Sequence, residues 1–245
     1  MSEGQQQGRI RRALADAVHR LGWLDGGLYL CSRLLERLSG GRARLVKYHI
    51  VAQPVGAGAF DAVRADPATV VAPAGPGNPL VPVFPRPAAI IQQRFAIGAE
   101  CLTAEVKGSF AGYLWLARQA YDEDEVRCRF ILQDPMRSVW DFDVYVEPRF
   151  RLGRTMARLW QAADARLAAQ GVAWTFSRIS AFNAESLSAH GRLGVVKCHS
   201  LVFVVLGRLQ LSFLPHWPYL HLSISDLSPP QIHLPLPSAH RQGGS

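Results

Sequence analysis

The first hundred residues show helical and extended patterns of hydrophobic positions in turn. Apolar residues recur every three or four positions in IRRALADAVHRL (10–21) and LYLCSRLLERL (28–38), which is typical of amphipathic helices. Gly40 and Gly41 predict the end of this helical region. After them we expect a strand in ARLVKYHIVAQPV (43–55), loops rich in Pro, Gly and Ala over 56–87 with a short strand near 69–72, and a short helix over 88–97.

Residues 100–207 predict strands followed by alternating helices and strands. CLTAEVKG (101–108) and SFAGYLWLARQAY (109–121) form a predicted hairpin around Lys107-Gly108. The further predicted elements are strands in EVRCRFIL (125–132) and SVWDFDVYV (138–146), a helix over 152–170, a strand in VAWTFSRI (172–179), a helix over 184–193 and a strand in CHSLVFVVLG (198–207). This order predicts an α/β (α+β) fold with a mixed, mostly antiparallel central sheet flanked by helices.

Three regions are expected along the chain. Residues 1–99 extend or complete the fold, residues 100–207 form its core, and residues 208–245 make a Pro-rich, irregular C-terminal tail that ends in SAHRQGGS.

Composition narrows the class of protein. The chain has 245 residues, 49% of them hydrophobic, which predicts a packed core, and no apolar run long enough to span a bilayer. MSEGQQQGRIRR at the start does not resemble a secretory signal, so we expect a cytoplasmic protein. Four single cysteines offer no C-x-x-C pair, and no metal site is expected.

The net charge of +8 comes from 24 arginines and three lysines. Most arginines are scattered and do not interleave with aromatic residues, so nucleic-acid binding is not expected. One local group stands out in PRFRLGRTMAR, where Arg149, Arg151, Arg154 and Arg158 surround the predicted start of a helix. Positive charge is unfavourable at the positive end of a helix dipole, and this arrangement therefore favours a bound anion.

A polar stripe runs along the short helix predicted after residue 183. Asn183, Ser186, His190 and Gly194 are separated by three, four and four residues, which places them on one helix face. Asn183 is also a good N-cap for a helix that begins at Ala184.

Two segments together resemble the GCN5-related N-acetyltransferase (GNAT) superfamily, as a divergent member. VYVEPRFRLGRTMARLW resembles the family's strand end and R-x-x-G-x-G/A loop, with Val146-Glu147-Pro148 and Arg151 at matching positions. NAESLSAHGRLGV resembles N-x-x-A-x-x-x-Y-x-x-x-G-F, with Asn183, Ser186, His190, Gly194 and Val195 in register. The resemblance covers roughly residues 100–207 and implies a GNAT-like fold and an N-acyltransferase that uses acetyl-CoA or another acyl-CoA.

The family's donor site is carried over position by position. In the family, the pantetheine arm enters between the strands before and after the loop, and its phosphates meet the helix N-terminus. The residues implied for the donor are Val144, Tyr145, Val146, Arg151, Leu152, Gly153, Arg154, Thr155, Met156, Ser177, Asn183 and Ser186.

Transfer to an amine needs a base, because a protonated amine is not a nucleophile, and benefits from an acid for the leaving thiolate. Asp141, Asp143 and Tyr145 alternate along the strand 138–146, so we expect them on one face and take both aspartates as base candidates. The alternative is that these aspartates face solvent or pair with Arg178. His190 occupies the position of the family's acid Tyr, and a histidine there could donate a proton near neutral pH.

The loop departs from the family pattern at two positions. Arg154 and Met156 stand where glycine lets the backbone approach the pyrophosphate of coenzyme A. An acidic acyl carrier protein, whose arm carries a single phosphodiester, is therefore an alternative donor and partner that suits the arginines. A non-catalytic GNAT-like protein that binds an acyl thioester or an acidic protein partner is the alternative function.

Overall fold

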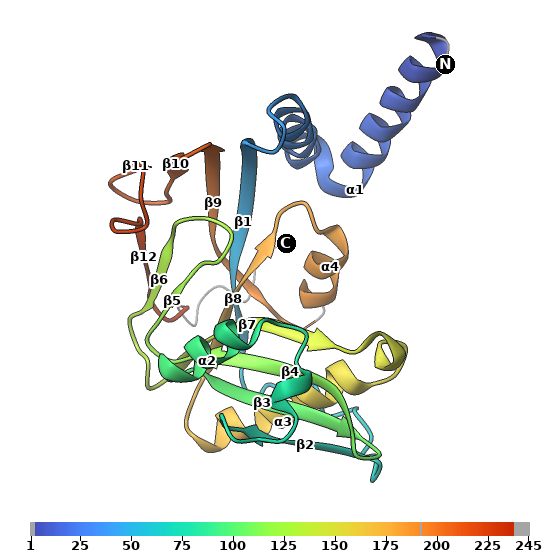
Figure 1. Ribbon diagram of the computed structural model, residues 1–245, viewed down its shortest axis with the longest axis vertical. Helices are drawn as coiled ribbons and strands as arrows, with labels where there is room; N and C mark the ends of the chain where they lie inside the picture. The colour runs from blue at the N-terminus through green and yellow to red at the C-terminus, as the bar shows by residue number, and fades with distance from the viewer. Residues whose placement is uncertain (1–2, 192, 238–245) are drawn as a thin grey trace. The chain divides into compact units, whose positions relative to one another are not determined.

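The computed structural model describes residues 3–191 and 193–237, with side chains from residue 19 onward (Figure 1). The predicted SAHRQGGS end lies outside the described residues. The helices are α1 (Glu3–Leu38), α2 (Ala88–Ala96), α3 (Thr155–Ala169) and α4 (Ala184–Gly191), with 3-10 turns η1 (Val81–Val83) and η2 (Pro148–Phe150). Among the described residues no helix is long and apolar enough to cross a membrane.

The strands begin with β1 (Ala43–Pro54), β2 (Thr69–Ala74), β3 (Glu100–Val106), β4 (Ser109–Ala117), β5 (Ala120–Asp122) and β6 (Arg129–Leu132). They continue with β7 (Ser138–Val146), β8 (Trp174–Ser180), β9 (Val196–Leu206), β10 (Leu209–Phe213), β11 (Leu220–Ser223) and β12 (Gln231–Leu234). Strand β10 pairs antiparallel with β9 and β11, β3 with β2 and β4, and β4 with β7, whereas β7 and β8 are parallel. The predicted mixed, mostly antiparallel sheet flanked by helices is confirmed.

The chain divides into two compact units, each built from separated stretches of sequence. The first unit contains residues 1–51, 122–130 and 178–232, and the second contains 52–121, 131–177 and 233–245. In hydrogen-bonded order the strands of the first unit are β11-β10-β9-β1-β8, and those of the second are β8-β7-β4-β3-β2. Strands β1 and β8 contribute residues to both units. A separate small sheet has the order β12-β6-β5.

The hairpin between β3 and β4 follows from the two residues at its turn. Lys107 and Gly108 both have positive φ, 51° and 73°, as a tight two-residue hairpin turn requires. Val106 then pairs with Ser109, and the predicted hairpin is confirmed.

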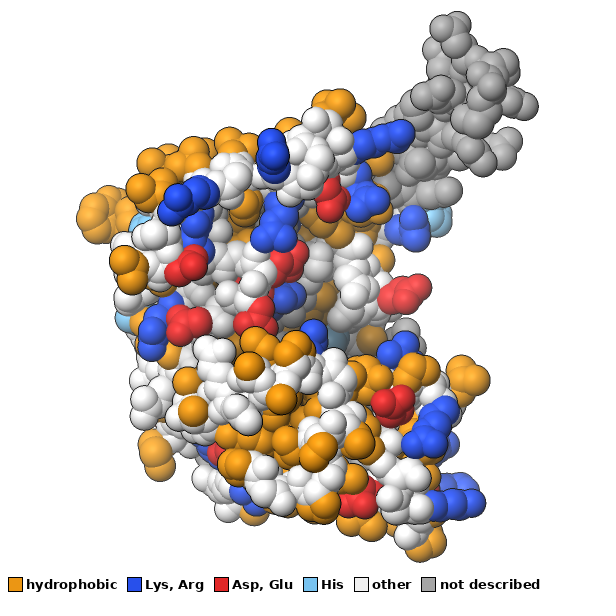
Figure 2. Space-filling view, in the orientation of Figure 1, with side chains coloured by type: hydrophobic (Ala, Val, Ile, Leu, Met, Phe, Trp, Pro, Cys, Tyr) orange, Lys and Arg blue, Asp and Glu red, His pale blue; other side chains and the backbone are white. Residues whose placement is uncertain are grey.

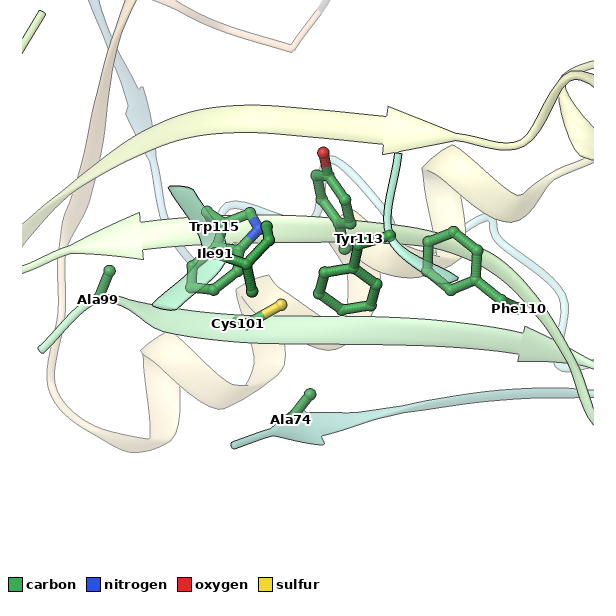
Figure 3. Packing of buried hydrophobic residues seen from close by; sticks show 8 residues of the cluster. Ala74, Ile91, Ala99, Cys101, Phe110, Tyr113 and Trp115 are labelled. Carbon is green, nitrogen blue, oxygen red and sulfur yellow. The ribbon is translucent and has the colours of Figure 1, made fainter. Parts of the chain in front are cut away.

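The sheet of the second unit is covered on both faces. Gly112 of β4 faces α3, since a Cβ built on it would lie 3.3 Å from the Leu159 side chain. Tyr113 and Trp115 alternate with Gly112 along β4 and therefore lie on its other face. There they belong to a cluster that includes Ile91 of α2 and Phe84. Figure 3 shows the Phe110, Tyr113 and Trp115 rings along β4, with Cys101 of β3 and Ala74 of β2 beside them.

Gly112 is required by the close approach of β7. A Cβ at this position would lie only 2.3 Å from the backbone oxygen of Tyr145. We therefore expect Gly112→Ala to push β4 and β7 apart and to destabilise the protein by about 1–3 kcal/mol. Urea unfolding measures this effect, with Gly75→Ala as the control, because Gly75 has open space around it and no positive φ. Equal stability of Gly112→Ala and the parent chain would contradict the close approach.

The prediction of an irregular tail over 208–245 is wrong for three segments, which form β10, β11 and β12. Leu209–Phe213 pairs with Val202–Leu206, and buried Gln210 and Ser212 alternate with less buried neighbours along β10. The Gln210 side chain donates to the Arg127 carbonyl at 2.7 Å and accepts from the Arg127 N–H at 2.8 Å. Pro215 and Pro218 lie in the connection between β10 and β11, so they interrupt no strand.

The first unit contains a buried polar network around the acidic segment 122–125. Arg178 of β8 lies 2.6 Å from Glu123, whose side chain is fully buried, and 3.9 Å from Glu125. Its guanidinium stacks 4.5 Å from the centre of the Tyr48 ring, and the Tyr48 hydroxyl donates to Glu125. The carboxylate partners of Arg178 are therefore these glutamates, and the alternative pairing with Asp141 or Asp143 is wrong.

Candidate active site

A β-bulge in β7 decides where its two aspartates point. Asp141 pairs with Leu116 and Val144 with Leu114, so β7 has two residues, Phe142 and Asp143, opposite Trp115. Leu114 and Leu116 share a face with Gly112, whereas Tyr145 pairs with Tyr113 on the other face. The prediction that Asp141, Asp143 and Tyr145 share one face is therefore wrong for Asp141, because the extra residue reverses the alternation.

Asp141 is a buried carboxyl group with a strongly perturbed pKa. The residue is only 8% exposed. Burial raises the pKa of its carboxyl group to about 7, and a hydrogen bond with the Ser177 side chain opposes part of that rise. A carboxyl group that titrates near pH 7 can accept a proton from a substrate at physiological pH.

Asp143 is in a different environment two residues later. Its carboxylate accepts hydrogen bonds from Arg86 at 2.8 and 3.0 Å, from Arg94 at 2.5 Å and from the Tyr113 hydroxyl at 3.0 Å. Burial alone would raise the pKa of Asp143, but the two arginines outweigh it and the pKa is lowered. A carboxylate held this firmly in its charged form is a weak proton acceptor, and this geometry favours Asp141 as the base.

The backbone at Asp143 adopts a conformation that side chains rarely take. Its φ is +38°, in the left-handed region that Asp and Asn tolerate better than other non-glycine residues. This conformation is held by the four hydrogen bonds that Arg86, Arg94 of α2 and Tyr113 of β4 donate to the carboxylate. Arg94 is itself 7% exposed and lies between the rings of Trp115 and Phe142, 5.4 and 5.1 Å from their centres. Asp143 thus fixes the shape of the bulge that follows Asp141.

The residues Arg86, Arg94 and Tyr113 were not predicted as site residues. They lie 57, 49 and 30 positions from Asp143 along the chain, and only the packing of α2 and β4 against β7 joins them. Periodicity shows which strand a residue occupies but not which helix covers its face.

The pairing of β7 with β8 ends just before Asp141. The parallel register joins Ser138, Val139 and Trp140 to Trp174, Thr175 and Phe176. Asp141 and Ser177 are the next residues on the two strands, and the Ser177 side chain acts to lower the pKa of the Asp141 carboxyl group. Beyond Asp141, residues Val144, Tyr145 and Val146 pair with β4 on the other edge of β7.

The loop after β7 leads into α3 with exposed positive charge. Arg154 occupies the N-cap position and gives no side-chain cap, and the first turn of α3 contains no acidic residue. Leu152, Gly153, Arg154 and Met156 are exposed, whereas Thr155 is 2% exposed. The backbone N–H groups at this end of the helix, together with its dipole, are suited to an anion.

The four clustered arginines are not equivalent. Arg158 forms an ion pair with Asp66 at 2.9 Å and donates to the Thr69 hydroxyl at 3.1 Å. Arg151 donates from Nε to the Val146 carbonyl at 2.9 Å, and Arg149 stacks on the Phe150 ring. Among the described residues the Arg154 side chain forms no ion pair, hydrogen bond or cation–π contact, so its guanidinium is the most available of the four to a ligand.

The polar stripe of α4 belongs to the first unit. Asn183 accepts the Ser186 N–H at 3.0 Å, and the predicted N-cap is confirmed. His190 Nδ1 lies 2.8 Å from the Ser186 carbonyl, which can only accept, so Nδ1 carries the proton in this contact. Nε2 is then an acceptor, and it donates a proton only when the ring is an imidazolium. Gly194, with φ of 72°, lies beyond the end of the helix at Gly191.

Comparisons with known proteins give partial structural likeness at low identity. No protein-family model and no curated protein matches the chain. A conserved protein of unknown function from Staphylococcus epidermidis ATCC 12228 is 12% identical, with a TM-score of 0.48 over 71% of this chain and 67% of that one. A GCN5-related N-acetyltransferase-like protein from Streptococcus suis 89/1591 is 12% identical, with a TM-score of 0.41 over 75% and 67% of the two chains.

The tandem GNAT protein from the clavulanic acid biosynthesis pathway is 17% identical, with a TM-score of 0.46 over 65% of this chain. The alignment spans about half of that protein, 53% of its length. Proteins of the GNAT superfamily are thus among the solved structures to which this chain is similar.

Proposed function

We propose that this protein is a GNAT-like N-acyltransferase that moves an acyl group from a pantetheine thioester to an amine. The observation that carries the proposal is the end of the β7–β8 pairing, where the Asp141 carboxyl group is buried and its pKa is raised to about 7. A base with this pKa is what amine acylation at neutral pH requires.

In the proposed reaction Asp141 takes a proton from the substrate ammonium group. The neutral amine attacks the thioester carbonyl carbon and a C–N bond forms. The nitrogen then loses its second proton to water, and the C–S bond breaks as the thiolate leaves. The bulge held by Asp143 keeps the backbone and Asp141 in place. His190 is proposed to protonate the thiolate, for which it must first be in the imidazolium form.

The donor is proposed to bind with its phosphate groups at the start of α3. Arg154 supplies charge, Arg149 and Arg151 flank it, and the first-turn N–H groups donate hydrogen bonds. Val144, Tyr145, Val146 and Ser177 belong to the strands on which the arm is expected to lie. Asn183 and Ser186 are proposed donor contacts at the start of α4, where Asn183 also accepts the Ser186 N–H.

Donor binding is tested by thermal unfolding of the purified protein with coenzyme A, acetyl-CoA, a long-chain acyl-CoA and an acylated carrier protein in turn. A donor present at about 100 times its Kd adds roughly 2.7 kcal/mol, which raises the Tm by about 5–10 °C in a chain of this size. A shift with one donor identifies the acyl class, and release of free thiol on adding amines then measures transfer. No shift with any donor would overturn the proposal, and binding without thiol release would favour a non-catalytic binding protein.

The role of Arg154 has its own test. We expect Arg154→Glu to weaken donor binding by roughly 10- to 100-fold, because a charge-assisted hydrogen bond contributes about 1.5–3 kcal/mol. Arg64→Glu is the matched control, since it makes the same charge change at an exposed position of the same unit. Equal loss of affinity in both variants, measured by calorimetry, would show that only the net charge of the protein matters.

A further inference from the structure

Lysine is rare in this chain, and two of its three lysines meet in the first unit. The chain has 24 arginines against Lys47, Lys107 and Lys197. Lys47 on β1 and Lys197 on β9 both approach a group formed by Asp25 of α1 and His49 of β1. Arginine keeps its charge in any environment, whereas the pKa of a lysine responds to its surroundings.

The Asp25 carboxylate forms an ion pair with Lys47 but not with Lys197. Asp25 Oδ1 lies 2.5 Å from Lys47 Nζ, and the other oxygen lies 3.8 Å from His49 Nε2. Lys197 Nζ lies 3.5 Å from His49 Nε2 and forms no ion pair among the described residues. His49 is 5% exposed, and its Nδ1 lies 3.0 Å from the Ser200 hydroxyl.

The surroundings of Lys197 favour its neutral form. Burial lowers the pKa of Lys197, the Lys47 ammonium group lowers it further, and Asp25 opposes them. Burial, with Lys197 and Lys47, also lowers the pKa of His49, so that this ring is neutral at pH 7. When Nδ1 donates to Ser200, the lone pair of Nε2 faces Lys197 and can accept its proton.

Lys197 remains accessible despite these contacts. The residue is exposed on β9, and Ser200 on the same strand is exposed as well, whereas Lys47 is held by Asp25 with 17% of its side chain exposed. An exposed amine without a carboxylate partner is open to electrophiles.

We propose that Lys197 is a nucleophilic amine and a site of acylation by small activated acyl donors, with His49 as proton acceptor. The donor class is an acyl phosphate or an acyl thioester. The Nζ lone pair attacks the carbonyl carbon and a C–N bond forms. In an acyl phosphate the C–O bond breaks and phosphate leaves with the electron pair, and in an acyl thioester the C–S bond breaks and the thiolate leaves with it. The proton that the amine loses passes to His49 and then to water.

The proposal is tested by comparing how fast the lysines of one sample are acetylated. The protein is treated with a limiting amount of acetyl phosphate between pH 6.5 and 9, and the acetylated peptides are quantified by mass spectrometry. Lys107, in the exposed turn of the second unit, is the reference within each sample. We expect Lys197 to be acetylated several-fold faster than Lys107 at the lower pH values, and the two rates to converge as pH rises. Equal rates across the range would overturn the proposal. Acetyl phosphate reacts without an acyltransferase, so this result is independent of the function proposed above.

Two variants change the ratio of Lys197 to Lys107 labelling in opposite directions. Lys47→Gln removes the neighbouring positive charge and releases Asp25 to pair with Lys197, so labelling of Lys197 falls. Asp25→Asn removes the opposing carboxylate, so labelling of Lys197 rises. Lys47→Arg keeps the charge and leaves the ratio unchanged, and Glu36→Gln is a control for loss of an exposed carboxylate on the same helix. An unchanged ratio in both Lys47→Gln and Asp25→Asn, with native circular dichroism, would also overturn the proposal.

Discussion

At pH 8, Asp141→Asn is expected to be more stable than the parent chain although it no longer transfers acyl groups. Below pH 4 the Asp141 carboxyl group is protonated in both the folded and the unfolded protein. Between pH 4 and its folded pKa of about 7, only the unfolded state ionises, so the unfolded state is favoured as pH rises. The loss amounts to about 4 kcal/mol and is complete above pH 7. Asparagine does not ionise, so Asp141→Asn does not lose this stability as pH rises.

Urea unfolding of both proteins from pH 4 to pH 8 measures this difference. The advantage of Asp141→Asn over the parent should grow with pH, while Asp61→Asn, an exposed aspartate of the same unit, should follow the parent. Parallel curves for Asp141→Asn and the parent would show that Asp141 is not held protonated. In the transfer assay, loss of the base should lower kcat/KM by roughly 10²–10⁴-fold, and the parent's rate should rise with pH through about 7.

Asp143→Ala is expected to destabilise the second unit by about 3–5 kcal/mol. The substitution removes the carboxylate that accepts hydrogen bonds from Arg86, Arg94 and Tyr113, and Arg94 is buried. Breaking a buried ion pair by deleting one partner leaves a charge whose burial is not compensated. Asp143→Asn keeps an acceptor oxygen and tolerates the positive φ, so it should lose less.

The pH dependence of this loss has the opposite sign to that of Asp141. The lowered pKa of Asp143 contributes stability above the ordinary pKa of an aspartate and loses it as pH falls through the folded value. The difference in unfolding free energy between the parent and Asp143→Ala should therefore shrink in acid. Asp61→Ala again serves as the control, with an expected change within about 0.5 kcal/mol. A difference that stays constant down to pH 2 would contradict the ion-pair interpretation.

Local chemistry explains what the sequence predicted correctly. The residue pattern of SVWDFDVYV predicted the strand at 138–146, Lys107-Gly108 predicted the hairpin, and Asn183 predicted the start of α4. Each of these signals is contained within a few neighbouring residues.

The features that were not predicted depend on contacts between residues far apart in the sequence. The bulge opposite Trp115 leaves the hydrophobic pattern of β7 intact, and it is visible only in the register with β4. The partners of Asp143 come from α2 and β4, and Arg178 pairs with Glu123 rather than with either aspartate. The strands after residue 208 were missed because the prolines between them suggested an irregular tail, whereas Pro215 and Pro218 lie in a connection.

Strand β10 has a consequence for any shortened form of the protein. It covers the backbone of Val202–Leu206 on β9, and Phe203 of that strand is fully buried against Tyr48. A chain that stopped near residue 207 would expose this row of N–H and C=O groups beside apolar side chains. Such an uncovered edge is a template for strand addition by a second molecule, and self-association would compete with folding. Figure 2 shows one face of the chain, on which charged side chains lie among hydrophobic ones.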